Sequence, residues 1–287
     1  MRILLTGGTG FIGKALAAVL ERRGDEVVTV SRGGPVRWDA MEGEVERADA
    51  VVHLAGEPVA DERWTPERLE RIRSSRVDTT DRVARAIAAA AHKPRVLVSA
   101  SAVGFYGMRS DDVIRDERTP AGDDVLARLT VAWEGAAARA RDAGVRVVHP
   151  RIGVVLGRGG GALAKMIGPF RWFVGGPLGG GTQWLSWVHL RDAVRALLLL
   201  VDRDDLAGPV NIVAPAPVTM NEMSEAIARS LGRPSALRVP AFALRLALGE
   251  GLAHLLLTGQ RVAPSRLLEA GFAFELPSID EALRDLR

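Results

Sequence analysis

The chain has no cysteine, one tyrosine, three lysines and no long apolar run among its 287 residues. Without cysteine there are no disulfides, no thiolate catalysis and no cysteine-ligated metal, and we predict no metal site. The longest aliphatic run covers residues 196–201, which is far too short to span a bilayer. Because a strand pattern begins at residue 2, we expect no signal peptide. These absences favour a cytoplasmic protein without a membrane partner.

The charged residues are balanced and interleaved. There are 38 basic residues, almost all of them arginine, and 35 acidic ones, which gives a formal net charge of +3. Because acidic residues are spread among the arginines, the chain has no basic stripe of the kind that binds nucleic acid. We therefore expect no nucleic-acid partner. Apolar residues make up 47% of the chain, enough for a substantial core.

The most informative stretch is the run TGGTGFIG, which begins at Thr6. An apolar strand pattern precedes it and an alanine-rich helix pattern follows it. Its three spaced glycines allow a tight turn, close approach of the backbone to a pyrophosphate and close packing of the helix on the strand. The N-terminus of the helix would then face the phosphates. This context predicts a dinucleotide site, with these contributors: Thr6, Gly7, Gly10, Phe11, Ile12 and Gly13.

The second strand pattern, residues 26–31, ends where a parallel sheet would hold the adenosine ribose of a dinucleotide. The residues at this point are Ser31 and Arg32. An NAD site usually carries an acidic residue here, whereas an arginine suits a 2′-phosphate. We therefore predict NADP(H) as the cofactor, with Ser31 and Arg32 at its 2′-phosphate. A solvated loop arginine is the alternative explanation of Arg32.

A third strand pattern, residues 49–56, is apolar and ends in small residues beside the expected dinucleotide. Its last residues are predicted to contact the dinucleotide through their backbone: Leu54, Ala55 and Gly56. Glu57 is a candidate ribose or substrate ligand, or a solvated loop residue. One long helix is predicted from residue 65 to about residue 91. On this helix, Arg76 is a candidate phosphate or ribose ligand or, equally, a surface arginine.

A fourth strand pattern, residues 95–101, continues into the segment AVGFYG. Residues at the carboxyl ends of parallel strands face the ligand crevice, so this strand is expected to carry the catalytic chemistry. We assign Ser99 to cofactor binding, and Ser101 and Tyr106 to catalysis. The alternative for Tyr106 is a packed aromatic ring with its hydroxyl in water.

Five segments in combination resemble the extended short-chain dehydrogenase/reductase family: TGGTGFIG, HLAG, VSASAVGFYG, PRIGVVLG and WVHLRD. The chain is most similar to an atypical branch of NAD(P)-dependent epimerase/dehydratase-like proteins. These carry a small extra C-terminal domain of unknown function, which residues 239–287 resemble. The resemblance covers essentially the whole chain. It implies a Rossmann-type fold and NADP(H) binding, and it leaves the substrate undefined.

The same resemblance implies roles for three residues. Arg151 resembles a family residue that lines the pyrophosphate and nicotinamide end of the cofactor. Val155 would present its backbone to the nicotinamide amide. Ser101 matches the serine that orients the substrate in the family.

One family feature is missing. Members carry a Tyr-x-x-x-Lys pair, in which tyrosine moves the proton and lysine lowers the tyrosine pKa. When Trp133 and Glu134 are aligned with the family, Leu126 and Thr130 fall at these two positions. General acid–base assistance contributes about 10²- to 10⁴-fold in rate. Either another group carries the proton, with Tyr106 or a bound water as the candidate, or the protein is not a turnover enzyme.

Other candidates are weaker. Glu134 lies beside a packing tryptophan, and His189 is more simply explained as a structural residue. Glycine-rich loops at residues 157–161 and 175–181 are either substrate lids or crossovers between domains. Three tryptophans near these loops suit a flat apolar ligand or burial in an interdomain seam: Trp172, Trp184 and Trp187.

We predict an α/β protein with a Rossmann-type, doubly wound parallel sheet and a smaller, mostly helical C-terminal substrate lobe. Residues 1–160 and 186–215 are assigned to the dinucleotide-binding domain, and residues 161–185 and 216–287 to the lobe. The function implied by the resemblance is NADP(H)-dependent hydride transfer to a small polar substrate, either a carbonyl compound or a sugar nucleotide. The alternative is a catalytically silent NADP(H) sensor. A homodimer follows by family analogy alone.

Overall fold

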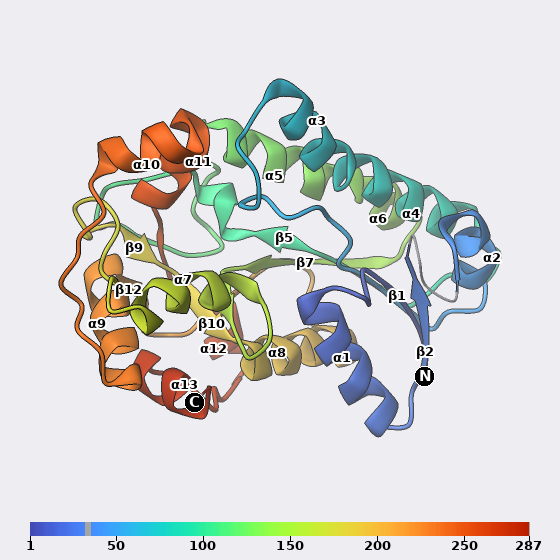
Figure 1. Ribbon diagram of the computed structural model, residues 1–287. Helices are drawn as coiled ribbons and strands as arrows, with labels where there is room; N and C mark the ends of the chain where they lie inside the picture. The colour runs from blue at the N-terminus through green and yellow to red at the C-terminus, as the bar shows by residue number, and fades with distance from the viewer. Residues whose placement is uncertain (32–35, 287) are drawn as a thin grey trace.

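The computed structural model describes residues 1–31 and 36–286. Its centre is a parallel sheet in the order β11-β7-β4-β3-β1-β2, with β5 paired to β7 (Figure 1). All the carboxyl ends of these strands therefore lie at one edge of the sheet, and the predicted α/β fold is confirmed. The strands are β1 Arg2–Thr6, β2 Glu26–Val30, β3 Ala50–His53, β4 Val96–Ser99, β5 Ser101–Ala102, β7 Arg146–Ile152 and β11 Gly208–Ile212.

Helices cover both faces of the sheet, because alternate strand residues point to opposite sides. Ile3 and Leu5 pack with α1 (Phe11–Arg22) and α8 (Leu190–Asp202) on one face. Leu4, between them, packs on the other face with α2 (Met41–Val45), α4 (Val77–Ala89) and α6 (Ala138–Asp142). Figure 1 shows α1 and α8 below the sheet and α4, α5 (Val125–Ala136) and α6 above it. The strands are accordingly apolar on both sides.

The C-terminal lobe is mostly helical. Its core joins α7 (Gly161–Arg171), α9 (Met220–Leu231) and α13 (Ile279–Asp285), and α10 (Ala241–Leu248) packs beside α11 (Glu250–Leu257). Capping boxes begin α9 and α13, as their sequences predict. No helix in the described ranges is long and apolar enough to cross a membrane. The remaining elements are η1 Trp38–Ala40, α3 Pro66–Ser74, η2 Val103–Tyr106, β6 Ile114–Arg115, β8 Val154–Leu156, β9 Trp184–Leu185, β10 Trp187–His189, β12 Val218–Thr219, β13 Arg261–Val262 and α12 Ser265–Glu269.

The long helix predicted over residues 65–91 is wrong in one respect, because it is broken into α3 and α4. The break falls at Ser75 and Arg76. The Ser75 hydroxyl donates to the carbonyl of Ile72 at 2.9 Å, and the Thr79 hydroxyl donates to the carbonyl of Ser75 at 2.8 Å. Such side-chain bonds satisfy carbonyl groups that a continuous helix would use, so they compete with helical geometry. Residues 125–142 likewise form two helices, α5 and α6.

The turn between β1 and α1 depends on two close approaches. Gly7 has a φ of 74°, and a Cβ atom there would lie 2.7 Å from the backbone carbon of Leu54. A Cβ atom on Gly13 would overlap the carbonyl oxygen of Gly7. Glycine is therefore required at both positions, and the helix packs directly on the turn.

Replacing Gly13 with alanine is expected to destabilise the fold by about 2–3 kcal/mol, because the new methyl group forces the helix away from the turn. Gly43, in the short helix α2, is the matched control, since a Cβ atom there meets nothing within 4 Å. Gly43→Ala is expected to stabilise by about 0.5–1 kcal/mol. Urea unfolding measures both changes. Equal effects of the two substitutions would contradict this account of the turn.

His53 makes stability depend on pH. Its buried ring lies between the hydroxyls of Thr6, 2.6 Å from Nδ1, and Thr79, 3.4 Å from Nε2, and burial lowers its pKa to about 4 from 6.5. Between these values the unfolded chain binds the proton and the folded protein does not. The contribution of His53 is therefore fully present above about pH 6.5 and is lost as the pH falls towards 4.

We expect His53 to account for about 3 kcal/mol of the stability lost between pH 6.5 and pH 4. The His53→Gln variant should show a correspondingly shallower loss in urea unfolding at a series of pH values. The exposed residue His92, changed to glutamine, is the control and should leave the slope unaltered. An unchanged slope in His53→Gln would refute this assignment.

Candidate cofactor and substrate site

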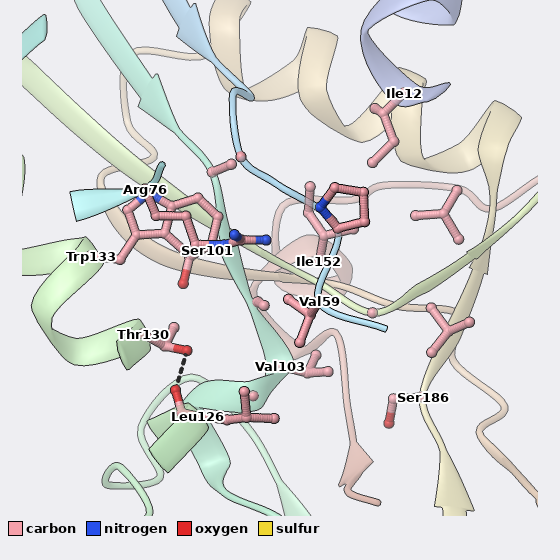
Figure 2. A pocket seen from close by; sticks show the side chains of 18 of the residues that line it. Ile12, Val59, Arg76, Ser101, Val103, Leu126, Thr130, Trp133, Ile152 and Ser186 are labelled. Atoms are coloured by element: carbon pink, nitrogen blue, oxygen red, sulfur yellow. Dashed lines mark hydrogen bonds between the residues drawn. The ribbon is translucent and has the colours of Figure 1, made fainter. Parts of the chain in front are cut away.

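A cavity of about 580 Å³ lies at the carboxyl edge of the sheet and extends to the C-terminal lobe. Its walls come from the glycine turn, the ends of β3, β5 and β7, the helix α5 and the lobe (Figure 2). Most of the residues assigned from the sequence to the cofactor or to catalysis line it: Gly7, Gly10, Phe11, Ile12, Gly13, Leu54, Gly56, Glu57, Arg76, Ser101 and Val155.

The glycine turn has the features that a pyrophosphate requires. Helix α1 begins at Phe11 without a side-chain cap and without an acidic residue in its first turn. Its N-terminal N–H groups and the positive end of its dipole therefore remain suited to an anion. Gly7 and Gly13 line the cavity, and because they have no side chains, the backbone of the turn is accessible from it. These residues fit the predicted dinucleotide.

The end of β2 carries an unused polar atom. Ser31 is buried, and its Oγ has no hydrogen-bond partner among the described residues. A buried hydroxyl without a partner is costly unless a ligand or water bonds to it. This observation fits the 2′-phosphate contact predicted for Ser31. Arg32, the other residue of that prediction, lies outside the described residues.

Arg76 brings a positive charge to the cavity. It caps the N-terminus of α4, and its guanidinium lies over the ring of Trp133, 5.1 Å from the ring centre. It donates only long hydrogen bonds, to Ile72 O and Ser75 Oγ at 3.3 and 3.4 Å, and in the described part of the chain it has no ion-pair partner. Burial lowers its pKa to about 10, so it is charged at neutral pH. Arg76 is therefore suited to an anion in the cavity.

Glu57 lines the cavity with its charge already engaged. Its carboxylate pairs with Arg68 at 2.5 Å, and its backbone N–H donates to Ser75 Oγ at 3.0 Å. These contacts hold the loop after β3 against the break between α3 and α4. Glu57 is thus an anchored residue of the cavity wall.

Ser101 lies on the cavity wall and bonds to a carboxylate behind it. Its hydroxyl donates to Oε1 of Glu134 on α5 at 2.6 Å. Arg151 on β7 binds the same carboxylate through Nε and Nη2 at 2.8 and 3.0 Å. Ser101 thus begins a chain of charge-assisted bonds that runs away from the cavity. The sequence did not single out Glu134 for this role, since its neighbour Trp133 indicated a packing face.

The Tyr106 hydroxyl does not face the cavity, so the geometry does not support the catalytic role predicted for it. Tyr106 is 1% exposed; its hydroxyl donates to Oδ1 of Asn211 at 2.8 Å and accepts from Nη1 of Arg151 at 3.1 Å. Burial raises its pKa, which makes it a poorer source of tyrosinate. The alternative, a hydroxyl in water, is not supported either. Tyr106 belongs to the buried network behind Ser101.

The geometry does not support the cofactor contact predicted for Arg151 either. The side chain is buried and lies over the Phe105 ring, and it donates hydrogen bonds to Glu134 and Tyr106. It is therefore held behind the cavity wall and does not reach the expected position of the pyrophosphate. Its charge fixes Glu134 instead.

Three further predicted residues lie near the cavity without lining it. The Thr6 hydroxyl is bonded to His53 in the sheet. Ser99 is fully buried at the end of β4, and its hydroxyl lacks a partner in the described structure. Ala55 supports the turn, since its backbone nitrogen would lie 2.8 Å from a Cβ atom on Gly7. These side chains build the frame around the site.

Helix α5 presents no ionisable side chain to the cavity. Four of its residues line the wall: Leu126, Leu129, Thr130 and Trp133. The Thr130 hydroxyl donates to the carbonyl of Leu126 at 2.7 Å, so it is engaged within the helix (Figure 2). Trp133 donates through its ring nitrogen to Thr80 at 3.0 Å. The groups that this wall offers to a ligand are therefore mainly apolar.

The C-terminal lobe completes the cavity, and apart from Trp184 its lining residues are ones that the sequence did not reveal. Seven residues of the lobe and its connections line the wall: Trp184, Leu185, Ser186, Leu255, Thr258, Gly259 and Gln260. Of the three tryptophans considered, Trp184 is in the wall, Trp187 is buried and Trp172 is 81% exposed. No local pattern could have found the segment 258–260, because it reaches the site through the packing of the lobe.

Comparisons with known proteins agree with this architecture. Residues 3–213 match the model of the NAD dependent epimerase/dehydratase family, and residues 239–286 match a domain of unknown function. Among curated relatives, the epimerase family protein SDR39U1 of Bos taurus is 41% identical, with 100% of this chain and 99% of that protein covered. The epimerase family protein YfhF of Bacillus subtilis is 37% identical, with 100% and 98% covered.

A solved structure is similar over the whole chain. The human epimerase family protein SDR39U1, crystallised with NADPH, superposes with a TM-score of 0.95 and 38% identity, covering 100% of this chain and 99% of that one. The chain therefore belongs to the NAD-dependent epimerase/dehydratase family, as a member that also carries the C-terminal domain of unknown function.

Proposed function

We propose that the protein binds NADP(H) and supports hydride transfer between the nicotinamide and a substrate carbon held beside Ser101. The observation that carries this proposal is one continuous cavity that joins the glycine turn to Ser101. The human relative that crystallised with NADPH supports the choice of cofactor. The Ser31 hydroxyl, which has no hydrogen-bond partner among the described residues, supports it from within this chain.

Different residues around the cavity would contact different parts of the cofactor. Gly7, Gly10 and the start of α1 would hold the pyrophosphate, and Ser31 with Arg32 would hold the 2′-phosphate. Arg76 supplies the cation for a phosphate or ribose in the cavity. Leu54 and Gly56 contribute backbone to the dinucleotide, and Val155 lies where the nicotinamide end is expected.

When bound, the nicotinamide donates or accepts a hydride at C4. The chain's own task is to orient the substrate and move its proton. Because Tyr106 faces away from the cavity, Ser101 is the polar group placed for both tasks. Its contact with Glu134 connects it to a group that can take up a proton.

A cytoplasmic location and pairing with a second copy of the chain accompany this proposal as expectations from the sequence and the family. The catalytic chemistry does not require the second copy. Ser101, Glu134 and the glycine turn all belong to one chain.

The alternative function is an NADP(H) sensor that does not turn over. It is favoured by α5, whose wall of Leu126, Leu129, Thr130 and Trp133 has no ionisable side chain in the position where the family resemblance implies a tyrosine and a lysine. A sensor would bind the nucleotide in the same turn and retain its hydride.

A single-turnover experiment separates these functions. The protein is loaded with 4-deuterated NADPH and mixed with a panel of carbonyl compounds that includes keto-sugar nucleotides and aromatic ketones, and products are followed by mass spectrometry. Deuterium in a product is the expected result. Ser101→Ala should slow its appearance by about 10²-fold or more. Full retention of the deuterium with tight NADPH binding would overturn the proposal in favour of the sensor.

Ser110→Ala is the matched control, since Ser110 is an exposed loop serine. It should transfer deuterium at the rate of the unmodified protein. Equal slowing in both variants would show that the loss in Ser101→Ala does not come from the site.

A further inference from the structure

The hydrogen bond of Ser101 decides which groups the cavity can recognise. A serine hydroxyl has one proton and two lone pairs. The Ser101 proton is donated to the Glu134 carboxylate at 2.6 Å, and within the described residues no group donates to Ser101 Oγ. Towards the cavity Ser101 therefore offers lone pairs. A ligand group that meets it has to be a donor, such as an alcohol hydroxyl, because the acceptor oxygen of a ketone would meet a second acceptor.

This orientation is fixed from behind. Glu134 is held by two hydrogen bonds from Arg151, and Arg151 is held by Tyr106 and by the face of the Phe105 ring, 3.3 Å from its guanidinium carbon. Tyr106 in turn bonds to Asn211, whose amide donates to the carbonyl of Ala263 at 2.9 Å. In the described structure, none of the side chains of this network has a buried polar atom without a partner. Glu134 cannot turn away without leaving a buried charge unpaired.

The other polar groups on the substrate side of the cavity are already bonded to the protein. Ser186 donates to the carbonyl of Gln260 at 2.6 Å, and Gln260 donates to the carbonyl of Gly107. Thr258 donates to the carbonyl of His254 at 2.7 Å, and Thr130 donates within α5. The free surface on this side is therefore mostly hydrocarbon and aromatic: Val59, Val103, Leu129, Trp184, Leu185 and Leu255.

Two residues bring charge to the wall. Among the described residues that line the cavity, Arg76 and Glu57 are the charged ones, and Glu57 is already paired with Arg68. The lobe brings no cation into the wall for the diphosphate of a sugar nucleotide. The hydroxyls of Thr130, Ser186 and Thr258 have no proton left to donate to an oxygen of a sugar. A ligand on this side gains affinity from apolar contact instead.

We propose that the substrate is an alcohol with an apolar or aromatic body, whose hydroxyl donates to Ser101, and that Glu134 is the proton acceptor behind Ser101. This inference rests on the proposed function, and it replaces the small polar substrate expected from the family resemblance. Ser101 touches the substrate, whereas Glu134 acts through Ser101.

The atoms balance for oxidation of the alcohol. The carbinol hydrogen leaves as hydride to the oxidised cofactor of the proposed function, and the carbon–oxygen bond becomes a carbonyl. The hydroxyl proton passes to Ser101 Oγ as the Ser101 proton passes to Glu134. In the reverse direction, protonated Glu134 returns the proton along the same path.

The test is a binding comparison of 1-phenylethanol with acetophenone, which share one body and differ in the donor. Both are titrated by calorimetry into the full-length protein holding tetrahydro-NADP, an analogue that cannot transfer hydride. The alcohol is expected to bind about tenfold more tightly than the ketone, the effect of one charge-assisted hydrogen bond. UDP-glucose is expected to bind more weakly than the alcohol.

Two variants locate the preference. Ser101→Ala should bind both ligands equally. In Glu134→Gln the amide can donate to Ser101 and turn its proton to the cavity, so the preference should vanish or favour the ketone. Glu225→Gln, at an exposed glutamate on α9, should keep the tenfold preference. Urea unfolding establishes that each variant is folded; if Glu134→Gln is not, Ser101→Ala alone decides.

Equal binding of the two ligands by the unmodified protein, a preference for the ketone, or tighter binding of UDP-glucose would overturn this inference. Deuterium transfer to a sugar nucleotide in the single-turnover experiment, without transfer to an aromatic ketone, would also overturn it while upholding the proposed function. A preference for the alcohol without any hydride transfer would instead uphold the binding inference and overturn the proposed function.

Discussion

The buried ion pair between Glu134 and Arg151 determines the chemistry of the cavity. It joins helix α5 to strand β7, so it also fixes the wall against the sheet. Removing either partner would leave an uncompensated buried charge, a loss of about 3–5 kcal/mol. Arg151 holds the carboxylate, and Ser101 donates its proton to it, away from the cavity. The hydroxyl of Tyr106 accepts a hydrogen bond from Arg151 in the interior. Glu134 thus acts on the cavity indirectly, because its carboxylate fixes the direction of the Ser101 hydroxyl.

The second constraint is the parallel sheet. Parallel pairing brings the ends of β1, β2, β3, β5 and β7 to one edge, where the glycine turn and Ser101 share a cavity. The lobe then closes the cavity with Trp184 and Leu255, whose surfaces are apolar. The walls differ in character, since Arg76 brings a cation beside Gly56 whereas the lining residues of the lobe carry no charge. One cavity can therefore hold a charged cofactor and an apolar substrate.

The sequence was sufficient for features that depend on local pattern. The glycine spacing at 7, 10 and 13 predicts the turn because each glycine has its own steric reason, and the capping box at Thr219 predicts the start of α9. Ser101 was placed correctly in the cavity wall because strand ends face the ligand in a parallel sheet. These features need only short-range geometry.

Features set by distant partners were not predictable. Tyr106 follows a strand end in the sequence, yet its hydroxyl pairs with Asn211, 105 positions away. The family resemblance assigns Arg151 to the cofactor, and the sequence does not show that Glu134 lies opposite it. Side-chain bonds across the fold decided both positions.

The most direct measurement is a high-resolution crystal structure of the protein with tetrahydro-NADP and 1-phenylethanol. The account predicts the ligand hydroxyl at about 2.6–2.9 Å from Ser101 Oγ, with Ser101 still bonded to Glu134 and the phenyl ring against Trp184 or Leu255. A Ser101 hydroxyl rotated away from Glu134, or a ligand hydroxyl bonded elsewhere in the cavity, would contradict the claim that Ser101 receives the substrate as an acceptor.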